Sequence, residues 1–236
     1  MEWVGPFAPL LHPPIADGGL GPYSGEVGPF GDVAHFARTS EHVVVVPLKS
    51  FASAKSRLRD AGTSDVTSMA ERLAHSVLQN CDPRPVFVVC ESDDVERFAT
   101  AHGAGVIRSP HAGLNHAVSF AYHQLGTYCE RVSIIHGDLR FPEGLGGFEP
   151  RGTITIVADR HGSGTNILSL PTGLSFRFQY GVGSALRHRY EAERLGIDVE
   201  TLTDSPWRFD IDVPEDLSVT DANGGPSAPH SLGTTL

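Results

Sequence analysis

Lysine is almost absent from this chain, and several familiar functional motifs are missing altogether. The sequence has only two lysines, Lys49 and Lys55, against sixteen arginines. It contains no G-x-x-x-x-G-K-[ST] segment, no G-x-G-x-x-G segment between a strand and a helix, and no G-x-S-x-G segment. These absences exclude a Walker-type NTPase, leave a dinucleotide-binding function unsupported and argue against covalent serine catalysis.

Cysteine, net positive charge and long apolar runs are also scarce. The three cysteines, Cys81, Cys90 and Cys129, form no C-x-x-C pair, so we expect reduced thiols in a cytoplasmic protein. The formal net charge of −10 argues against a nucleic-acid partner, because contacts to a phosphate backbone need a basic surface. No apolar segment approaches the roughly 20 residues of a membrane-spanning helix, so no membrane association is expected.

Strand-like and helix-like segments alternate between two ends that are rich in Gly and Pro. Residues 1–40 are expected to be an irregular or disordered extension, residues 41–219 a single domain, and residues 220–236 a disordered tail. The predicted strands cover residues 43–46, 86–90, 104–108, 132–136 and 153–157, and a short apolar run follows at residues 167–170. The predicted helices cover residues 65–80, 94–102, 114–125 and 184–195. This alternation predicts a three-layer α/β/α sandwich on a mostly parallel sheet.

The last part of the domain carries several local signals. Ser184 is expected to be the N-cap of the final helix, and Gly196 to follow its end. The segment WRFDIDVPEDL, residues 207–217, is predicted to be a strand followed by a helical turn that begins at a proline.

Both lysines lie in the turn after the first predicted strand, VVVVP. In open α/β sheets, ligands bind beyond the carboxyl ends of the strands. Two lysines at this place therefore suggest an anionic ligand, in particular a phosphate group. The alternative is a solvated basic loop.

Three aspartates are candidate ligands of a metal ion. Asp138 follows the buried strand VSIIH directly, where packing gives no reason for a carboxylate. Asp210 and Asp212 alternate in FDID, so in a strand they share one face. Mg²⁺ is typically held by one or two carboxylates together with the phosphates of its substrate. The alternative is that Asp212 caps the following turn and that Asp210 is a surface charge.

Two Gly-rich turns are candidate anion sites. The turn GSGT, residues 162–165, can present backbone N–H groups and a threonine hydroxyl to an anion. The turn GVGS, residues 181–184, precedes a helix, whose N-terminus favours phosphate. Either turn can instead exist for steric reasons, but together they suggest two anionic substrates. His188, on the helix that follows, is expected to lie on the helix surface, and the alternative is that it faces the site.

Six segments stand in this order along the chain: PLKSFASAKSRL, GLNHAVSFA, GDL, ADRHGSGTNILSL, FQYGVGSALRH and FDIDVPEDL. Together they resemble the guanylyltransferases of the deazaflavin coenzyme F-420 pathway. That family includes the 2-phospho-L-lactate and phosphoenolpyruvate guanylyltransferases. The resemblance runs from Val43 to Leu217. It implies a nucleotide-diphospho-sugar transferase-like fold, with residues 41–219 as a nucleotidyltransferase domain. It also implies transfer of GMP from GTP to a small phosphorylated carboxylic acid.

The resemblance assigns roles to individual residues. The catalytic cations Lys49, Lys55 and Arg57 would meet the triphosphate, and Asn115 would lie near the nucleoside. The three candidate aspartates would hold Mg²⁺.

The second substrate, the phosphorylated acid, also has assigned contacts. Thr165, Gly181 and Ser184 match the family positions that hold this acid. Phosphoenolpyruvate is the preferred acceptor. 2-Phospho-L-lactate, 3-phosphoglycerate and a sugar phosphate remain open as acceptors, because Thr165, Gly181 and Ser184 would bind the phosphate group of any of them. The choice of guanine rests on the resemblance alone.

The chain departs from the family pattern at two places within the resemblance and at its N-terminal extension. GDLRFP has Arg140 where the family has proline, and Val213 replaces a threonine. The first change leaves open a different acceptor, lower activity, or a catalytically silent paralogue that only binds nucleotide. We also consider a homodimer, although no residue pattern determines the oligomeric state.

Overall fold

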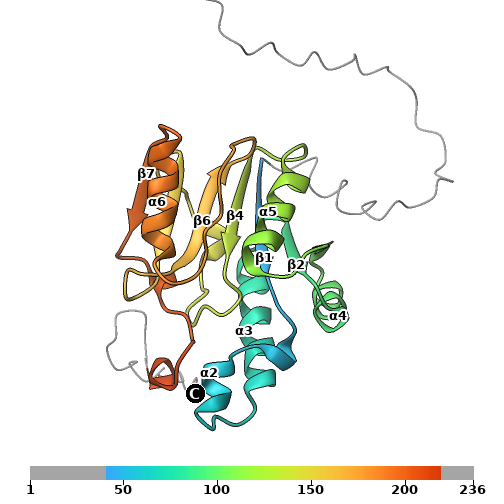
Figure 1. The fold of residues 1–236 in the computed structure, drawn as a ribbon. Helices are drawn as coiled ribbons and strands as arrows, with labels where there is room; N and C mark the ends of the chain where they lie inside the picture. Colours follow the sequence, from blue (N-terminus) through green and yellow to red (C-terminus); the bar gives the residue numbers. More distant parts are fainter. Residues whose placement is uncertain (1–40, 219–236) are drawn as a thin grey trace, which may run out of the picture.

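Seven strands form one twisted sheet in the computed structural model, which describes residues 41–218 (Figure 1). Their order across the sheet is β3-β2-β1-β4-β6-β5-β7. The strands are β1 (His42–Pro47), β2 (Val86–Cys90), β3 (Gly105–Arg108), β4 (Arg131–Ile135), β5 (Ile154–Ala158), β6 (Thr165–Pro171) and β7 (Val199–Leu202). Among these strands, β6 alone runs antiparallel to both neighbours. The mostly parallel sheet is therefore confirmed. The predictions for residues 1–40 and 220–236 lie outside the described residues.

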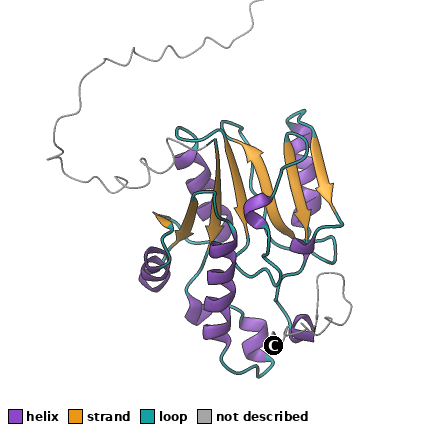
Figure 2. Cartoon of the chain, turned by 180° about the vertical axis from the view of Figure 1, so that it is seen from behind, coloured by secondary structure: helices purple, strands orange, loops and turns teal. Residues whose placement is uncertain are grey.

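Helices cover both faces of this sheet, as Figures 1 and 2 show from opposite sides. The helices are α2 (Ser56–Asp60), α3 (Val66–Asn80), α4 (Asp93–Ala101), α5 (Leu114–Leu125) and α6 (Ser184–Arg194). Short 3₁₀ turns are η1 (Phe51–Ser53), η2 (Leu145–Gly147), η3 (Pro206–Arg208) and η4 (Pro214–Ser218). Within residues 41–218, no helix is long and apolar enough to cross a bilayer.

Strand β1 shows why the sheet is buried on both sides. Val43 and Val45 belong to the core that α5 and α6 close, whereas Val44 and Val46 belong to the core that α3 and α4 close. Successive side chains of a strand point to opposite faces, so a continuous run of valines suits a strand covered on both. Full burial of one such side chain stabilises the fold by about 1.5–3 kcal/mol. The three layers expected from the sequence are therefore present.

Two local predictions near the C-terminus are wrong, and one strand was missed. The segment before FDID is the turn η3 and not a strand, because Pro206 has no N–H and Ser205 Oγ accepts the Trp207 N–H at 3.2 Å. Helix α6 has Gly183 and not Ser184 as its N-cap. Strand β7 was not predicted. Gly196 does follow α6, with the positive φ of 68° expected there.

Two adjacent glycines in η2 give a test of this packing. A methyl group added at Gly146 would overlap the backbone carbonyl of Asp82, whereas one added at Gly147 would meet no atom within 4 Å. We therefore expect Gly146→Ala to lower the free energy of unfolding by about 1–3 kcal/mol, the usual cost of overpacking. Gly147→Ala is the matched control and should change it by less than about 0.5 kcal/mol. Urea denaturation of both variants measures the difference, and equal effects would contradict this packing.

Candidate active site

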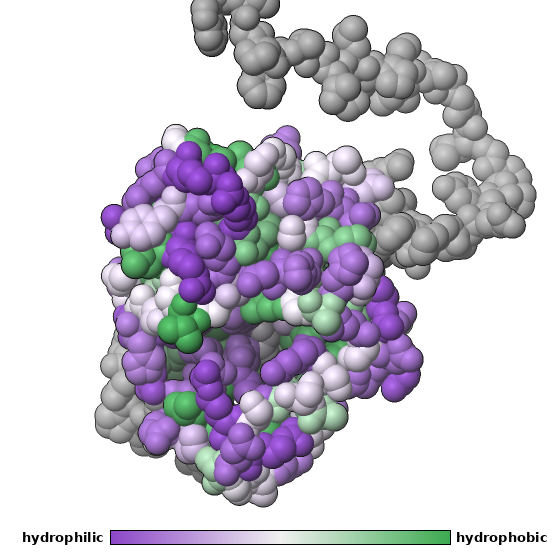
Figure 3. Space-filling model, in the orientation of Figure 1, coloured by the Kyte–Doolittle hydropathy of each residue, from purple (hydrophilic) through white to green (hydrophobic). Residues whose placement is uncertain are grey.

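A cavity of about 660 Å³ lies at the carboxyl ends of β1, β2 and β4. In the space-filling view, the surface is hollowed between the strand ends and α2 (Figure 3). The cavity is lined by the turn after β1, the end of β2, the start of α5 and residues 136–138 after β4. Lys49, Lys55 and Arg57 all line it. The basic turn therefore lies at the edge of the sheet where a ligand was expected.

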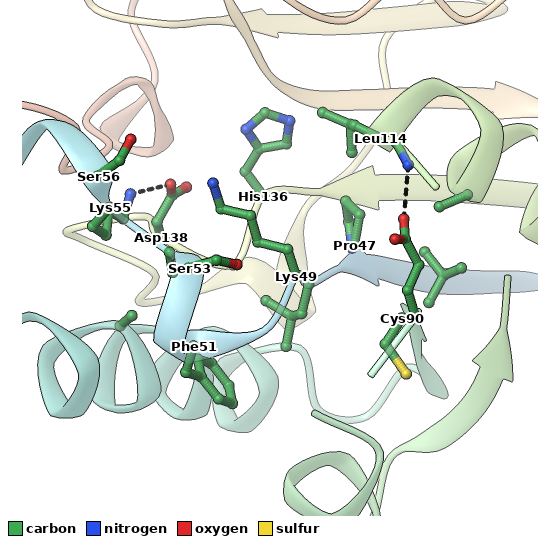
Figure 4. A pocket seen from close by; sticks show the side chains of 18 of the residues that line it. Pro47, Lys49, Phe51, Ser53, Lys55, Ser56, Cys90, Leu114, His136 and Asp138 are labelled. Carbon is green, nitrogen blue, oxygen red and sulfur yellow. Dashed lines mark hydrogen bonds and ion pairs between the residues drawn. The ribbon is translucent and has the colours of Figure 1, made fainter. Parts of the chain in front are cut away.

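Lys55 holds two of the candidate aspartates. It precedes α2 in the left-handed conformation, with φ of 56°, and its side chain is only 7% exposed. Its ammonium donates to Asp138 Oδ2 (Figure 4). It also donates to Asp212 Oδ1 at 3.2 Å. Burial alone would lower the pKa of Lys55, but the two carboxylates outweigh it and raise this pKa above its ordinary value. Burial alone would likewise raise the pKa of Asp138, and Lys55 keeps it low.

Asp210 is the carboxylate that lacks a comparable partner. Burial and the negative charges of Asp138 and Asp212 raise the pKa of Asp210 to about 7. In addition, Asp138 Oδ1 is buried and accepts no hydrogen bond. The electrostatic field at Asp210 is therefore negative, and Asp138 has an unused acceptor oxygen, both of which suit a cation.

The three aspartates do not form a complete Mg²⁺ site by themselves. Within residues 41–218, no three Asp, Glu, His or Cys side chains stand close enough to hold a metal ion by themselves. Carboxylate oxygens are the ligands that Mg²⁺ prefers, and it commonly takes its remaining ligands from water and substrate phosphates. The arrangement therefore fits an ion shared with a phosphate ligand. The metal role of the three aspartates stays a prediction.

Backbone pairing brings the three aspartates together. Leu139 and Asp210 form an antiparallel bridge, and the Ile211 N–H donates to the carbonyl of Asp138 at 3.2 Å. Asp216 then fixes the chain beyond, because its Oδ2 accepts the N–H groups of Asp212 and Val213 at 2.7 and 2.8 Å. The turn is thus capped by Asp216, and Asp212 is free to face Lys55.

Asp216 was missed in the sequence. It is 5% exposed and also pairs with Arg160 at 2.6 Å. The signal that could have revealed it is an aspartate at the third position of a turn that begins with proline.

Arg140, the departure from the family pattern, contacts the C-terminal segment. Its backbone N–H donates to the carbonyl of Phe209 at 2.8 Å, and its side-chain Nη2 donates to the carbonyl of Leu217 at 3.3 Å. It does not line the cavity. Arg140 therefore helps to hold the C-terminal segment beside Asp138.

The two Gly-rich turns are hydrogen-bonded to each other. In GSGT, the N–H groups of Ser163 and Gly164 donate to the carboxylate of Asp159, both at 2.8 Å. Ser163 Oγ accepts the N–H of Gly183, and the Ser163 carbonyl accepts the N–H of Ala185. The prediction that GSGT offers these N–H groups to an anion is thus wrong for this arrangement, because an internal carboxylate already takes them.

The residues assigned to the phosphorylated acid lie apart from the cavity. Thr165 and Ser184 are each 1% exposed, and Ser184 Oγ donates to Thr165 Oγ1 at 3.1 Å. Gly181 is exposed, and none of the three lines the cavity. Their role in binding the acid stays a prediction.

Asn115 also makes internal contacts. Its side-chain amide accepts the N–H of Tyr180 at 2.7 Å and donates to the Tyr180 carbonyl at 3.3 Å. Its neighbours Gly113 and Leu114 line the cavity, whereas Asn115 does not. Asn115 therefore ties α5 to the segment before α6, and its contact with a nucleoside stays a prediction.

His188 is fully buried, so its predicted place on the helix surface is wrong. Its Nε2 accepts the N–H of Gln179 at 2.9 Å, which leaves Nδ1 as the protonated nitrogen, 3.1 Å from Thr165 Oγ1. Burial and the nearby positive charge of Arg187 lower the pKa of His188 to about 3. A neutral histidine therefore anchors α6 to β6.

This anchor makes stability depend on pH. Below pH 6.5 the unfolded chain protonates His188, whereas the folded chain does so only near pH 3. We expect the free energy of unfolding to fall by up to about 1.4 kcal/mol per pH unit from this group as pH drops through that range. His188→Gln should be less stable at pH 7 and should lose this part of the slope. Urea denaturation from pH 7 to pH 4 measures it, and an unchanged slope would contradict the assignment.

Comparison with known proteins places this sequence in a family. The sequence profile described as "Guanylyl transferase CofC like" matches residues 42–224. A phosphoenolpyruvate guanylyltransferase of Conexibacter woesei is 31% identical over 210 residues, which covers 80% of this chain and 92% of that protein. A 3-phospho-D-glycerate guanylyltransferase of Phenylobacterium zucineum is 33% identical over 143 residues, covering 56% and 65% respectively.

A solved structure supports the fold. A protein of Desulfovibrio desulfuricans G20, described as a nucleotide-diphospho-sugar transferase, superposes with a TM-score of 0.61 at 14% identity. The match covers 76% of this chain and 86% of that one. At this identity the likeness concerns the fold alone, and it confirms the fold type that the sequence suggested.

Proposed function

Because the chain belongs to the family of CofC-like guanylyl transferases, and is thus a nucleotidyltransferase, we propose that it transfers GMP from GTP to a small phosphorylated carboxylic acid. The observation that carries this proposal is the cavity that combines Lys49, Lys55 and Arg57 with Asp138. A phosphate-rich nucleotide needs cations around it, and a metal-bound phosphate needs carboxylates beside it.

The reaction follows from the chemistry of two phosphates. A phosphate oxygen of the acid attacks the α-phosphorus of GTP, and a new phosphoanhydride bond forms. The bond between the α- and β-phosphates breaks, and its electron pair leaves with pyrophosphate. The attacking oxygen is already anionic, so no general base is required. Orientation and neutralisation of charge therefore lower most of the barrier.

The cations have different tasks in this proposal. The Lys55 ammonium is nearly buried and is held by two carboxylates. Lys49 is exposed at the cavity, and Arg57 is 68% exposed with Nη1 3.8 Å from Asp212. We assign the outer contacts with the triphosphate to Lys49 and Arg57. Lys55 holds the aspartates in place and makes a closer contact with the triphosphate. Mg²⁺ would be held by Asp138 with Asp210 or Asp212, and when bound it would neutralise phosphate charge.

Phosphoenolpyruvate is our preferred acceptor, in a pathway to coenzyme F-420. The support is the Conexibacter relative, which is named for that acid and matches along 80% of this chain. The relative named for 3-phospho-D-glycerate matches along 56%. 2-Phospho-L-lactate is the third candidate, by the resemblance described above. Thr165, Gly181 and Ser184 remain the predicted contacts to the acid. A cytoplasmic location and a homodimer also remain predictions.

A catalytically silent paralogue is the alternative function. Its support was the change at Arg140, and this side chain lies outside the cavity. The cations and carboxylates of the site are all in place. The arrangement therefore favours an active enzyme.

The direct test is pyrophosphate release by the purified protein with Mg²⁺. Each of the four nucleoside triphosphates is combined with phosphoenolpyruvate, 2-phospho-L-lactate or 3-phosphoglycerate, and the product mass is determined. We expect release with GTP and phosphoenolpyruvate, giving enolpyruvyl-diphospho-guanosine. Release with another acid would keep the mechanism and replace the acceptor. Binding of GTP without release from any pair would favour the silent paralogue.

Removal of one charge tests the role of the aspartate cluster. Asp138→Asn keeps the size of the side chain but removes the charge next to Lys55. We expect kcat to fall at least about 100-fold, as when one preorganised electrostatic contact is lost. Asp204→Asn, an exposed residue that does not line the cavity, is the control and should keep the wild-type rate. Wild-type turnover by a folded Asp138→Asn protein at saturating Mg²⁺ would contradict the assignment.

A further inference from the structure

Glu91 is a carboxylate in the cavity that the reaction described above does not use. It follows β2 directly, lines the cavity and is exposed. Its Oε1 accepts the N–H of Gly113 at 2.8 Å, in the loop that leads into α5. This contact anchors the carboxyl group at the rim and leaves Oε2, together with the second lone pair of Oε1, to accept hydrogen bonds from a ligand.

Glu91 stands at the opposite side of the cavity from the basic site. Figure 4 shows Lys55 and Asp138 on one side and Cys90 and Leu114 on the other. Lys49 extends into the space between these two sides. The residues that flank Glu91 and Gly113 therefore lie away from the cations. A nucleotide with its triphosphate among the cations would direct its base to this side.

Apolar groups beside Glu91 suit a flat ring. Val89, Leu114 and Ala117 line the same cavity, and Leu114 is a large apolar side chain that is 38% exposed. A base that packs against Leu114 removes this exposed apolar surface from water, which favours binding, whereas Val89 and Ala117 are already buried. A carboxylate at the edge of such a surface can then contact the edge of the base.

We propose that Glu91 selects guanine by accepting hydrogen bonds from its N1–H and its exocyclic 2-amino group. This inference rests on the proposed function, since it assumes that the triphosphate lies among the cations. An ionised carboxylate only accepts hydrogen bonds. Guanine presents two adjacent donors at that edge, whereas adenine presents an acceptor at N1. The same contact therefore attracts guanine and repels adenine.

The test compares the affinities of nucleotides that differ at this edge. GTP, ITP and ATP are titrated into the full-length protein by calorimetry. ITP is the informative probe, because it keeps N1–H but lacks the 2-amino group. We expect the wild type to bind GTP about 10- to 100-fold more tightly than ITP, since hydrogen bonds to charged groups are strong. In Glu91→Gln this ratio should fall to about threefold or less.

Glu91→Gln separates base selection from a structural role. The glutamine can still accept the N–H of Gly113 through its amide oxygen, so a purely structural Glu91 predicts an unchanged ratio. Glu130→Gln is the matched control, because Glu130 is exposed and precedes the amino end of β4, outside the cavity. It should keep the wild-type ratio of GTP to ITP affinity.

The outcomes for the inference and for the proposed function differ. Glu91→Gln with the wild-type ratio, or a wild type that does not distinguish GTP from ITP, overturns the inference. In that case the proposed function still stands if GTP and an acid release pyrophosphate. If GTP binds with the expected selectivity and no acid reacts, the base selection stands and the transfer reaction fails. If the wild type binds none of the three nucleotides, both fail.

Discussion

The ion pairs of Lys55 are the interaction on which the candidate site depends. They join three segments that are distant in the sequence, namely the turn after β1, the residue after β4 and the FDID segment. A nearly buried ammonium is unfavourable unless it is paired, so its burial requires both carboxylates nearby. The aspartates in turn repel each other and need a cation. Each charge in this cluster therefore makes the position of the others favourable.

This balance explains why one part of the chain uses lysine when arginine serves elsewhere. A lysine ends in a compact ammonium, which can approach two carboxylates from the small space beside α2. The left-handed conformation of Lys55 turns its side chain toward Asp138, at the cost of some backbone strain. The ion pairs offset that strain. The site is thus held in place before any ligand binds, which is what catalysis by positioning requires.

The sequence predicted those features that depend on local pattern. Buried strands such as VFVVC have continuous apolar runs, and helices such as α5 have apolar periods. Tertiary contacts reinforce both patterns, and the predicted bounds of these two elements were correct. The position of Lys49, Lys55 and Asp138 at one end of the sheet followed from their places just after predicted strands. The failures arose where distant groups decide the outcome. His188 lies on a helix without a strong apolar face, and only its contacts with Thr165 and Gln179 account for its burial.

The two Gly-rich turns show the limit of motif reasoning most clearly. Backbone N–H groups at such turns attract anions, and here the anion is Asp159 of the same chain. The local pattern was right about the chemistry and could not tell an internal carboxylate from an external phosphate. Because Ser163 also accepts from Gly183, the turn positions the start of α6 against β6. A ligand at Gly181 would therefore meet a turn whose next residues are already hydrogen-bonded to Ser163 and Thr165, whereas Glu91 and Leu114 form an exposed rim.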